Sequence, residues 1–197
     1  MSLELLLSVA FGGSLLTYVL GKISSRLRDG FAVTVSLALV VMVGLLYGRE
    51  FETPLQLGFL GVRLALRMNM LSWFFAATIV GIGLLSIVFS LRYMSGRGRL
   101  DYYYSTVLFI NACMLGTVVA GDLLSFFFLW EMMSWSTFLL ISFKGGKAVF
   151  AGLKYIIMSI IGSLAMLFAI ISLYAAFSTL NITELASLIQ AAPAGYV

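Results

Sequence analysis

The chain has 197 residues, of which 62% are hydrophobic and only 10% are charged. A soluble domain is about 45–50% apolar and about 25% charged, so the few polar side chains here cannot cover a water-soluble globule of this size. The composition therefore excludes a soluble enzyme and predicts an integral membrane protein. The net charge of +4 does not indicate a nucleic-acid partner, because the basic residues lie in short clusters between apolar runs.

Six apolar segments are each close to the roughly 20 residues that a helix needs to cross the hydrocarbon core of a bilayer. We therefore predict an all-α integral membrane fold with six spans in residues 1–177. The last segment is the longest and must tilt or project into water. The predicted spans are approximately Leu3–Leu20, Phe31–Gly48, Met70–Tyr93, Tyr102–Gly121, Leu123–Phe143 and Ala148–Phe177.

Basic residues are concentrated in alternate connections between these spans. Since Lys and Arg are enriched in cytoplasmic loops, we predict that the odd-numbered loops are cytoplasmic and that both termini lie outside. The basic residues after the first, third and fifth spans are Lys22, Arg26, Arg28, Arg92, Arg97, Arg99, Lys144 and Lys147, and those on the opposite side are Arg49, Arg63 and Arg67.

The loop between Arg49 and Asn69 alternates apolar with polar or small residues from Val62 to Arg67, and a similar alternation begins at Leu55. Such alternation is typical of strands, so a small β-hairpin on the outer face is one hypothesis. It would need neighbouring protein over its apolar side, because an isolated hairpin is only marginally stable. An irregular loop is the other hypothesis, and the sequence does not decide between them.

The fifth segment carries a carboxylate, Glu131, near the middle of an otherwise apolar run. A charged side chain at the bilayer centre costs about 2.5–3.5 kcal/mol on insertion scales, so it is usually retained for a function such as proton or ion movement. Ser134, one turn further on, is placed to hydrogen-bond to Glu131 or to hold a water molecule. The simpler alternative is a carboxylate that pairs with a neighbouring helix.

Two further polar residues lie within the spans. Lys154 is in the first turns of the sixth segment, where it either extends to the cytoplasmic interface or forms a second station of a polar path. For Asn111, in the middle of the fourth segment, we favour an interhelical hydrogen bond over a role in such a path. The candidate residues for proton or ion translocation are therefore Glu131, Lys154, Ser134 and Asn111.

Residues 178–197 do not form a span and are predicted to be a separate tail. Leu185, Leu188 and Ile189 recur at helical spacing. This spacing predicts a short amphipathic helix that lies along the outer surface.

The chain is poor in residues that bind cofactors. It has one cysteine, Cys113, and no histidine, so it lacks the ligands of an iron–sulfur cluster and the commonest metal ligand. No set of catalytic residues is visible either. We expect no cofactor in this chain and proton chemistry that depends on carboxylates, lysine, tyrosine and water.

The fifth segment has a distinctive aromatic run that ends in Trp130-Glu131. In full this stretch reads Asp122-Leu-Leu-Ser-Phe-Phe-Phe-Leu-Trp-Glu131-Met-Met-Ser. Four shorter stretches lie before and after it: Met70-Leu-Ser-Trp-Phe-Phe, Ser90-Leu-Arg-Tyr-Met94, Ala151-Gly-Leu-Lys154-Tyr and Thr179-Leu-Asn-Ile-Thr-Glu-Leu185. Together they resemble the antiporter-like membrane subunits of respiratory complex I, of membrane-bound hydrogenases and sulfur reductases, and of multisubunit sodium/proton antiporters. The resemblance covers nearly the whole chain.

The resemblance implies the first half of a fold that usually has about fourteen spans around two inverted repeats. Glu131 matches the glutamate of the first half-channel, and Lys154 matches a lysine of the sixth span. The chain departs from the family by ending before the seventh span, which carries the lysine partner of that glutamate, and by having Asn69 where many relatives have aspartate. We therefore expect other membrane subunits as partners, one of which supplies the missing spans, in a prokaryotic plasma membrane.

Three functions are compatible with this resemblance. The first is a membrane subunit of a redox-driven complex that moves H+ or Na+, such as a membrane-bound hydrogenase, a sulfur reductase or a NADH/ferredoxin-quinone oxidoreductase, with iron–sulfur clusters in partner subunits. The second is a subunit of a stand-alone multisubunit cation/proton antiporter. The third is a structural remnant that does not transport ions. No residue of the chain separates the first two.

The predicted orientation is testable by cysteine labelling. In sealed cells, a membrane-impermeant thiol reagent should label Ser2→Cys and should leave Ser95→Cys unlabelled, since position 95 lies in a predicted cytoplasmic loop. Labelling of position 95 but not of position 2 would reverse the orientation.

Overall fold

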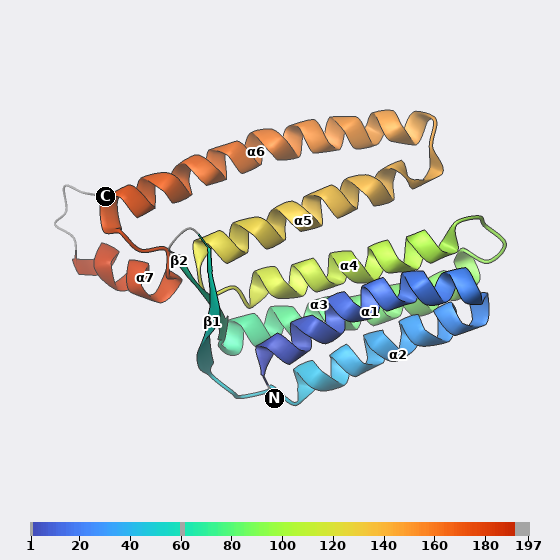
Figure 1. Ribbon diagram of the computed structural model, residues 1–197, viewed down its shortest axis with the longest axis horizontal. Helices are drawn as coiled ribbons and strands as arrows, with labels where there is room; N and C mark the ends of the chain where they lie inside the picture. The colour runs from blue at the N-terminus through green and yellow to red at the C-terminus, as the bar shows by residue number, and fades with distance from the viewer. Residues whose placement is uncertain (1, 60–61, 192–197) are drawn as a thin grey trace.

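The computed structural model describes residues 2–59 and 62–191, and it is almost entirely helical (Figure 1). Three helices begin after a polar residue, Ser2, Asn69 or Asp122, whose side chain accepts a hydrogen bond from a backbone N–H of the first turn. Such caps are favourable because the first N–H groups of a helix have no partner within it. The helices are α1 (Leu3–Ile23), α2 (Ser25–Gly44), α3 (Met70–Tyr93), α4 (Leu100–Val118), α5 (Leu123–Ile141), the short 3₁₀ helix η1 (Ser142–Lys144), α6 (Lys147–Phe177) and α7 (Ile182–Ala191).

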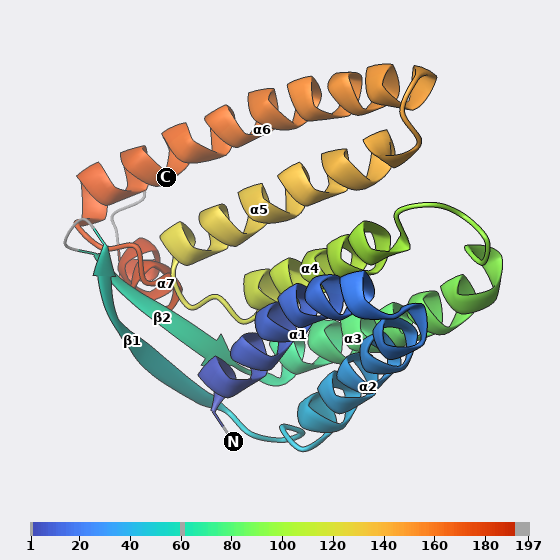
Figure 2. The same cartoon turned by 45° about the vertical axis from the view of Figure 1, so that its right-hand side comes forward.

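Five of these helices, α1, α2, α3, α5 and α6, are long and apolar enough to cross a membrane. The remaining predicted span, the fourth, corresponds to α4, which has 19 residues but is more polar, since it carries Asp101, three tyrosines and Asn111. It packs against α1, α3 and α5, so neighbouring helices shield much of its surface (Figure 2). The predicted all-helical membrane fold is confirmed, with α4 as its central helix.

The helices form a bundle of α1 to α4 to which α5 and α6 are added in order, so that α6 lies at the outer edge (Figures 1 and 2). The connections after α1, α3 and α5 all lie at one end of the molecule, and the hairpin and α7 lie at the other. This arrangement gathers the basic clusters of the alternate connections at a single end. Which side of the membrane that end faces stays a prediction.

The first connection is shorter than expected. α2 begins at Ser25 rather than near Phe31, so a single residue separates it from α1. Basic residues that we placed in a loop therefore lie within the first turn of α2. Arg28 is buried there because its guanidinium pairs with Asp29 at 2.7 Å and lies 5.2 Å from the centroid of the Tyr104 ring. These contacts satisfy the charge and allow the segment to remain helical.

Residues of the second connection form a β-hairpin. Strands β1 (Phe51–Phe59) and β2 (Val62–Met68) pair antiparallel, with Phe51 opposite Met68 and Glu52 opposite Arg67. This result confirms the hairpin hypothesis over the irregular loop, although Gly61, expected between the strands, lies outside the described residues. The backbone N–H of Arg67 donates to the carbonyl of Val119 at 2.7 Å. The hairpin is thus supported by the helical bundle, as its marginal stability requires.

Helix α7 buries Leu185 and lies beside the hairpin. The side-chain amide of Asn181, just before α7, donates to Glu52 at 2.6 Å, and the guanidinium of Arg67 donates to Thr183 at 2.9 Å. These contacts fix the start of the predicted tail to the hairpin. Residues 192–197 of that tail lie outside the described residues, and its position on the outer surface stays a prediction.

The turn between α4 and α5 contains a fully buried carboxylate, Asp122. One of its oxygens caps α5 by accepting from the backbone N–H of Ser125 at 2.7 Å, and the other accepts from the hydroxyl of Ser125 and the N–H of Ala65 in β2, each at 2.7 Å. The carbonyl of Leu180 accepts from the N–H of Leu123, which brings the segment after α6 to the same place. We call this meeting point of β2, the α4–α5 turn and the α6–α7 connection the Asp122 junction.

Replacement of Asp122 should destabilise the whole fold. Asp122→Ala removes a helix cap and leaves the N–H of Ala65 without its buried acceptor, so we expect a loss of about 3 kcal/mol in the free energy of unfolding. Asp122→Asn should cost less, because its remaining oxygen can still cap α5. The measurement is equilibrium unfolding in detergent micelles.

Glu50→Ala is the matched control, because Glu50 is an exposed acidic residue at the same end of the molecule. It should leave the free energy of unfolding nearly unchanged. Equal effects of Asp122→Ala and Glu50→Ala would contradict a structural role of the junction.

Candidate functional site

Glu131 lies near the middle of α5 and is half-buried. Its carboxylate accepts a hydrogen bond from the hydroxyl of Ser163, which lies near the middle of α6. Ser163 is itself buried. A carboxylate and a hydroxyl are therefore in contact between two predicted membrane spans, midway along both, where polar groups are costly and usually functional.

The face of α6 that packs on α5 is made of small and branched residues. Gly152, Ile156, Ser163 and Ile170 are its buried positions, and their spacing of four and seven residues follows one side of a helix. A Cβ atom on Gly152 would lie 2.2 Å from the hydroxyl oxygen of Ser142, so a larger residue at this position would force Ser142 to shift. The close packing near Gly152 and the small side chain of Ser163 together allow a short hydroxyl to reach Glu131.

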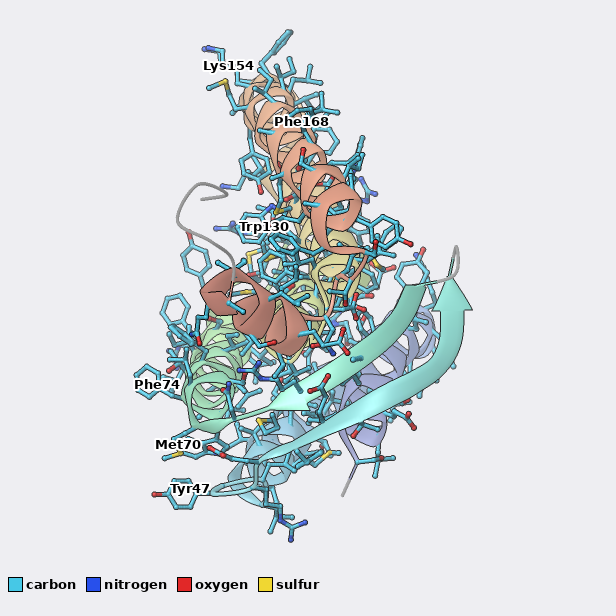
Figure 3. All side chains as sticks on the ribbon, turned by 90° about the vertical axis from the view of Figure 1, so that its left-hand side faces the viewer. Tyr47, Met70, Phe74, Trp130, Lys154 and Phe168 are labelled. Atoms are coloured by element: carbon cyan, nitrogen blue, oxygen red, sulfur yellow. The ribbon has the colours of Figure 1, made fainter. Side chains whose placement is uncertain are left out.

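Lys154 does not face this contact. Ser163 is nine residues further along α6, which is about two and a half helical turns, so the two side chains leave the helix on opposite sides. Figure 3 shows Lys154 at the edge of the molecule, on the side of α6 away from the bundle. Its side chain is exposed, and its ammonium forms no hydrogen bond or ion pair with the side chains that the structure describes. Any partner of Lys154 must therefore approach the outer face of α6.

Ser134 is buried on α5, one turn after Glu131. The hydroxyl that contacts the carboxylate belongs to Ser163 instead, and no hydrogen bond joins Ser134 to Glu131. The side chain of Ser134 is small, so it contributes to the packing of α5. Of the two roles suggested for Ser134, the direct hydrogen bond to Glu131 is not formed between the described side chains, and the holding of a water molecule stays a prediction.

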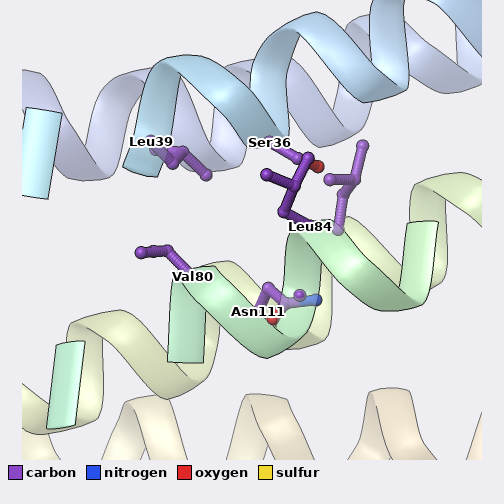
Figure 4. Close-up of a pocket in the computed structure, with 7 residues that line it drawn as sticks. Ser36, Leu39, Val80, Leu84 and Asn111 are labelled. Carbon is purple, nitrogen blue, oxygen red and sulfur yellow. The ribbon is translucent and has the colours of Figure 1, made fainter. Parts of the chain in front are cut away.

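Asn111 lies on α4 and faces α3, where it lines a small cavity with Val80 and Leu84 (Figure 4). Its amide donates to the carbonyl of Val107 in its own helix at 2.9 Å. A Cβ atom on Gly83 of α3 would lie 2.5 Å from the Asn111 side-chain oxygen, so α3 and α4 meet closely here. The adjoining cavity, lined also by Ser36, is only about 10 Å³. The hydrogen bond that the Asn111 side chain forms among the described residues is thus within α4, and the favoured interhelical hydrogen bond is not formed there.

Sequence reasoning missed Ser163 as the partner of Glu131. Ser159, Gly162 and Ser163 have the spacing of small residues that is typical of close helix packing, and this spacing alone gives no reason to place a hydroxyl beside Glu131. The spacing of Ser163 from Gly152 and Ile156 could have indicated this role. It places all three residues on the side of α6 that faces α5, provided that α5 and α6 are taken to pack together. Ser163 therefore both allows α6 to pack closely on α5 and donates the hydrogen bond to Glu131.

Family comparisons agree with this architecture. The family model described as "NADH:quinone oxidoreductase/Mrp antiporter, TM" matches residues 120–196, which include Glu131 and Ser163. The model described as "NADH-Ubiquinone oxidoreductase (complex I), chain 5 N-terminus" matches residues 55–104. The chain belongs to the complex I and Mrp antiporter family of membrane subunits.

Curated relatives include the Na(+)/H(+) antiporter subunits A1 of two staphylococci. The subunit of Staphylococcus haemolyticus is 34% identical over 139 residues, which is 68% of this chain and 17% of that protein. The subunit of Staphylococcus saprophyticus is 35% identical over 114 residues, which is 55% of this chain and 14% of that protein. The chain thus aligns with a small part of these long subunits.

Solved structures with the same fold come from three kinds of complex. A chain of the Mrp complex from Dietzia sp. DQ12-45-1b has a TM-score of 0.87 at 25% identity, covering 94% of this chain and 21% of that chain. A chain of the archaeal membrane-bound sulfane sulfur reductase has a TM-score of 0.84 at 22% identity, covering 94% and 39%. A chain of respiratory complex I from Thermus thermophilus has a TM-score of 0.73 at 17% identity, covering 90% and 38%.

The contact between Ser163 and Glu131 is testable by infrared spectroscopy. Ser163→Ala keeps the packing of α6 on α5 but removes the donor, so the carboxyl stretching band that Glu131→Gln abolishes should move to higher wavenumber. The loss of stability should be about 1 kcal/mol or less, as for other interhelical hydrogen bonds in membranes.

Ser172→Ala serves as the control for this measurement. Ser172 is exposed on the same helix and its hydroxyl donates to the carbonyl of Phe168 in α6. This substitution should leave the Glu131 band in place. A band that does not respond to Ser163→Ala would mean that the two side chains are apart in the membrane.

Proposed function

We propose that this chain is a membrane subunit of an ion-translocating complex and that Glu131 is the group through which a proton passes. The observation that carries this proposal is the contact of Glu131 with Ser163 midway between the ends of α5 and α6. A carboxylate can bind and release a proton, and a hydroxyl can both donate and accept a hydrogen bond. The pair is therefore suited to pass a proton between two hydrated segments.

The site needs further polar groups to form a path, and this chain offers few. Among the described residues neither Ser134 nor Asn111 forms a hydrogen bond with Glu131, and Lys154 lies on the face of α6 opposite to Ser163. We propose that spans packed against α5 and α6 complete the path, and that they bring a basic or hydrated polar group toward Glu131. An isolated buried carboxylate would otherwise lack the interactions that offset its desolvation.

Two classes of complex are candidates. The curated relatives are subunits of Na(+)/H(+) antiporters, which favours a multisubunit cation/proton antiporter in a prokaryotic cell membrane. A redox-driven complex is the second candidate, because the fold is shared with chains of the sulfane sulfur reductase and of complex I. Electron paramagnetic resonance of the reduced, purified complex distinguishes them, since iron–sulfur signals from partner subunits are expected only in the second class.

Glu131→Gln should abolish ion translocation without preventing assembly. The amide keeps the size of the side chain and its acceptor oxygen for Ser163, but it does not titrate. In proteoliposomes that contain the assembled complex, driven proton or cation flux should fall to the level of a complex that lacks this chain. Assembly is checked by the yield of the intact complex.

Lys154→Met is the comparison for this experiment. Because Lys154 is exposed and faces away from Glu131, its replacement should reduce flux less than Glu131→Gln does, unless another span joins it to the path. Full flux in the Glu131→Gln complex would exclude a half-channel through α5 and favour a structural role for the chain.

A further inference from the structure

A groove of about 220 Å³ lies at the basic end of the molecule, between the α3–α4 loop and the end of α5. Tyr93 and Arg97 line it from the side of α3, and Ile141, Phe143 and Lys144 line it from the side of α5. It lies at the ends of predicted membrane spans, where the hydrocarbon core of a bilayer meets the lipid headgroups. We call it the Arg97–Lys144 groove.

Two tight turns bring the two cations to the same groove. In the α3–α4 loop, Gly96 has a φ of 79°, and the N–H of Arg97 donates to the carbonyl of Met94 at 3.1 Å. After η1, Gly145 has a φ of 70°, and its N–H donates to the carbonyl of Ser142 at 2.9 Å. Positive φ values of this kind favour glycine, so the sequence of both loops suits these turns.

Neither cation has an acidic partner. Among the side chains that the structure describes, those of residues 2–53 and 65–191, the ion pairs are those of Lys22 with Asp101 and of Arg28 with Asp29. The guanidinium of Arg97 instead lies 4.8 Å from the centroid of the Tyr93 ring and donates to the sulfur of Met94 at 3.5 Å. The groove therefore presents two positive charges with no carboxylate to balance them.

The rest of the groove is apolar and aromatic. Phe143 lies against Tyr103, with 5.8 Å between the ring centroids, and against Tyr102, with 6.2 Å between them. Leu140 and Ile141 extend this wall along α5 toward the middle of the span. A ligand that fills the groove must therefore combine an anionic group at one end with an apolar body at the other.

We propose that the Arg97–Lys144 groove binds an anionic phospholipid. Its phosphate lies between the two cations, and the upper part of an acyl chain lies against Ile141 and Phe143. Two unbalanced cations favour a lipid with net negative charge over phosphatidylcholine, whose choline ammonium they repel. The apolar wall favours a lipid over a soluble phosphate. This site is separate from Glu131 and does not depend on the function proposed for it.

The test measures lipid binding to the full chain by native mass spectrometry. The purified protein is titrated with phosphatidylglycerol and with phosphatidylcholine that has the same acyl chains. Wild type should prefer phosphatidylglycerol by about tenfold or more, since one cation near an anionic lipid surface contributes roughly a fivefold factor. The double variant Arg97→Gln/Lys144→Gln should lose this preference, and Arg97→Lys/Lys144→Arg should keep most of it.

The matched control is Arg92→Gln/Lys147→Gln, which removes the same charge from exposed positions at the helix ends beside the same two connections, in the last turn of α3 and at the first residue of α6, but outside the groove. It should keep the preference. Three results would overturn the proposal: an unchanged preference in the groove variant, an equal loss in the control, or displacement of the lipid by millimolar inorganic phosphate. Loss of bound phosphatidylglycerol when the chain is purified within its complex would show that an acidic segment of a partner protein occupies the groove instead.

Discussion

The buried carboxylate of Asp122 joins parts of the chain that are far apart in sequence. The carboxylate caps the first turn of α5, and it accepts a hydrogen bond from the backbone N–H of Ala65, which lies 57 residues earlier. The backbone N–H of the adjacent Leu123 donates to the carbonyl of Leu180. The position of α5 relative to the hairpin and to the segment after α6 depends on this junction. Because hydrogen bonds to a charged acceptor are the stronger ones, three of them at one buried group fix the end of α5 firmly.

The contact between Glu131 and Ser163 depends on that position. α5 lies between the α1–α4 bundle and α6, and α6 lies at the outer edge of the molecule. Glycines allow α4 and α6 to lie close to the segment that contains α5. A Cβ atom on Gly116 of α4 would lie 2.9 Å from the side chain of Leu129, and Gly152 of α6 lies close to the side chain of Ser142. A shift of α5 along its axis would therefore meet steric resistance from two helices at once.

Much of this architecture was predictable, because each signal was local. Apolar runs predicted the helices, and the alternation from Val62 to Arg67 made a hairpin one of two hypotheses for the second connection. A carboxylate in an apolar run made Glu131 the candidate site, and its role stays a prediction. The errors came from features that depend on packing. The start of α2 was placed too late because the apolar run begins at Phe31, whereas the helix extends back to Ser25 and buries Arg28 against Tyr104 and Asp29. Likewise, the partner of Glu131 depends on which face of α6 meets α5, and this is decided by close packing at Gly152.

The Asp122 junction also imposes an order on biogenesis. A chain emerges from the ribosome with its N-terminus first, and early segments begin to fold before later ones exist. Leu180, which closes the junction, follows α6 in the sequence, so this closure must wait until α6 has entered the bilayer. Ser163 lies within that same helix, so Glu131 enters the membrane before its hydroxyl donor is available. The newly inserted α5 therefore holds its carboxylate by other means, such as water or the insertion machinery, until the next helix arrives.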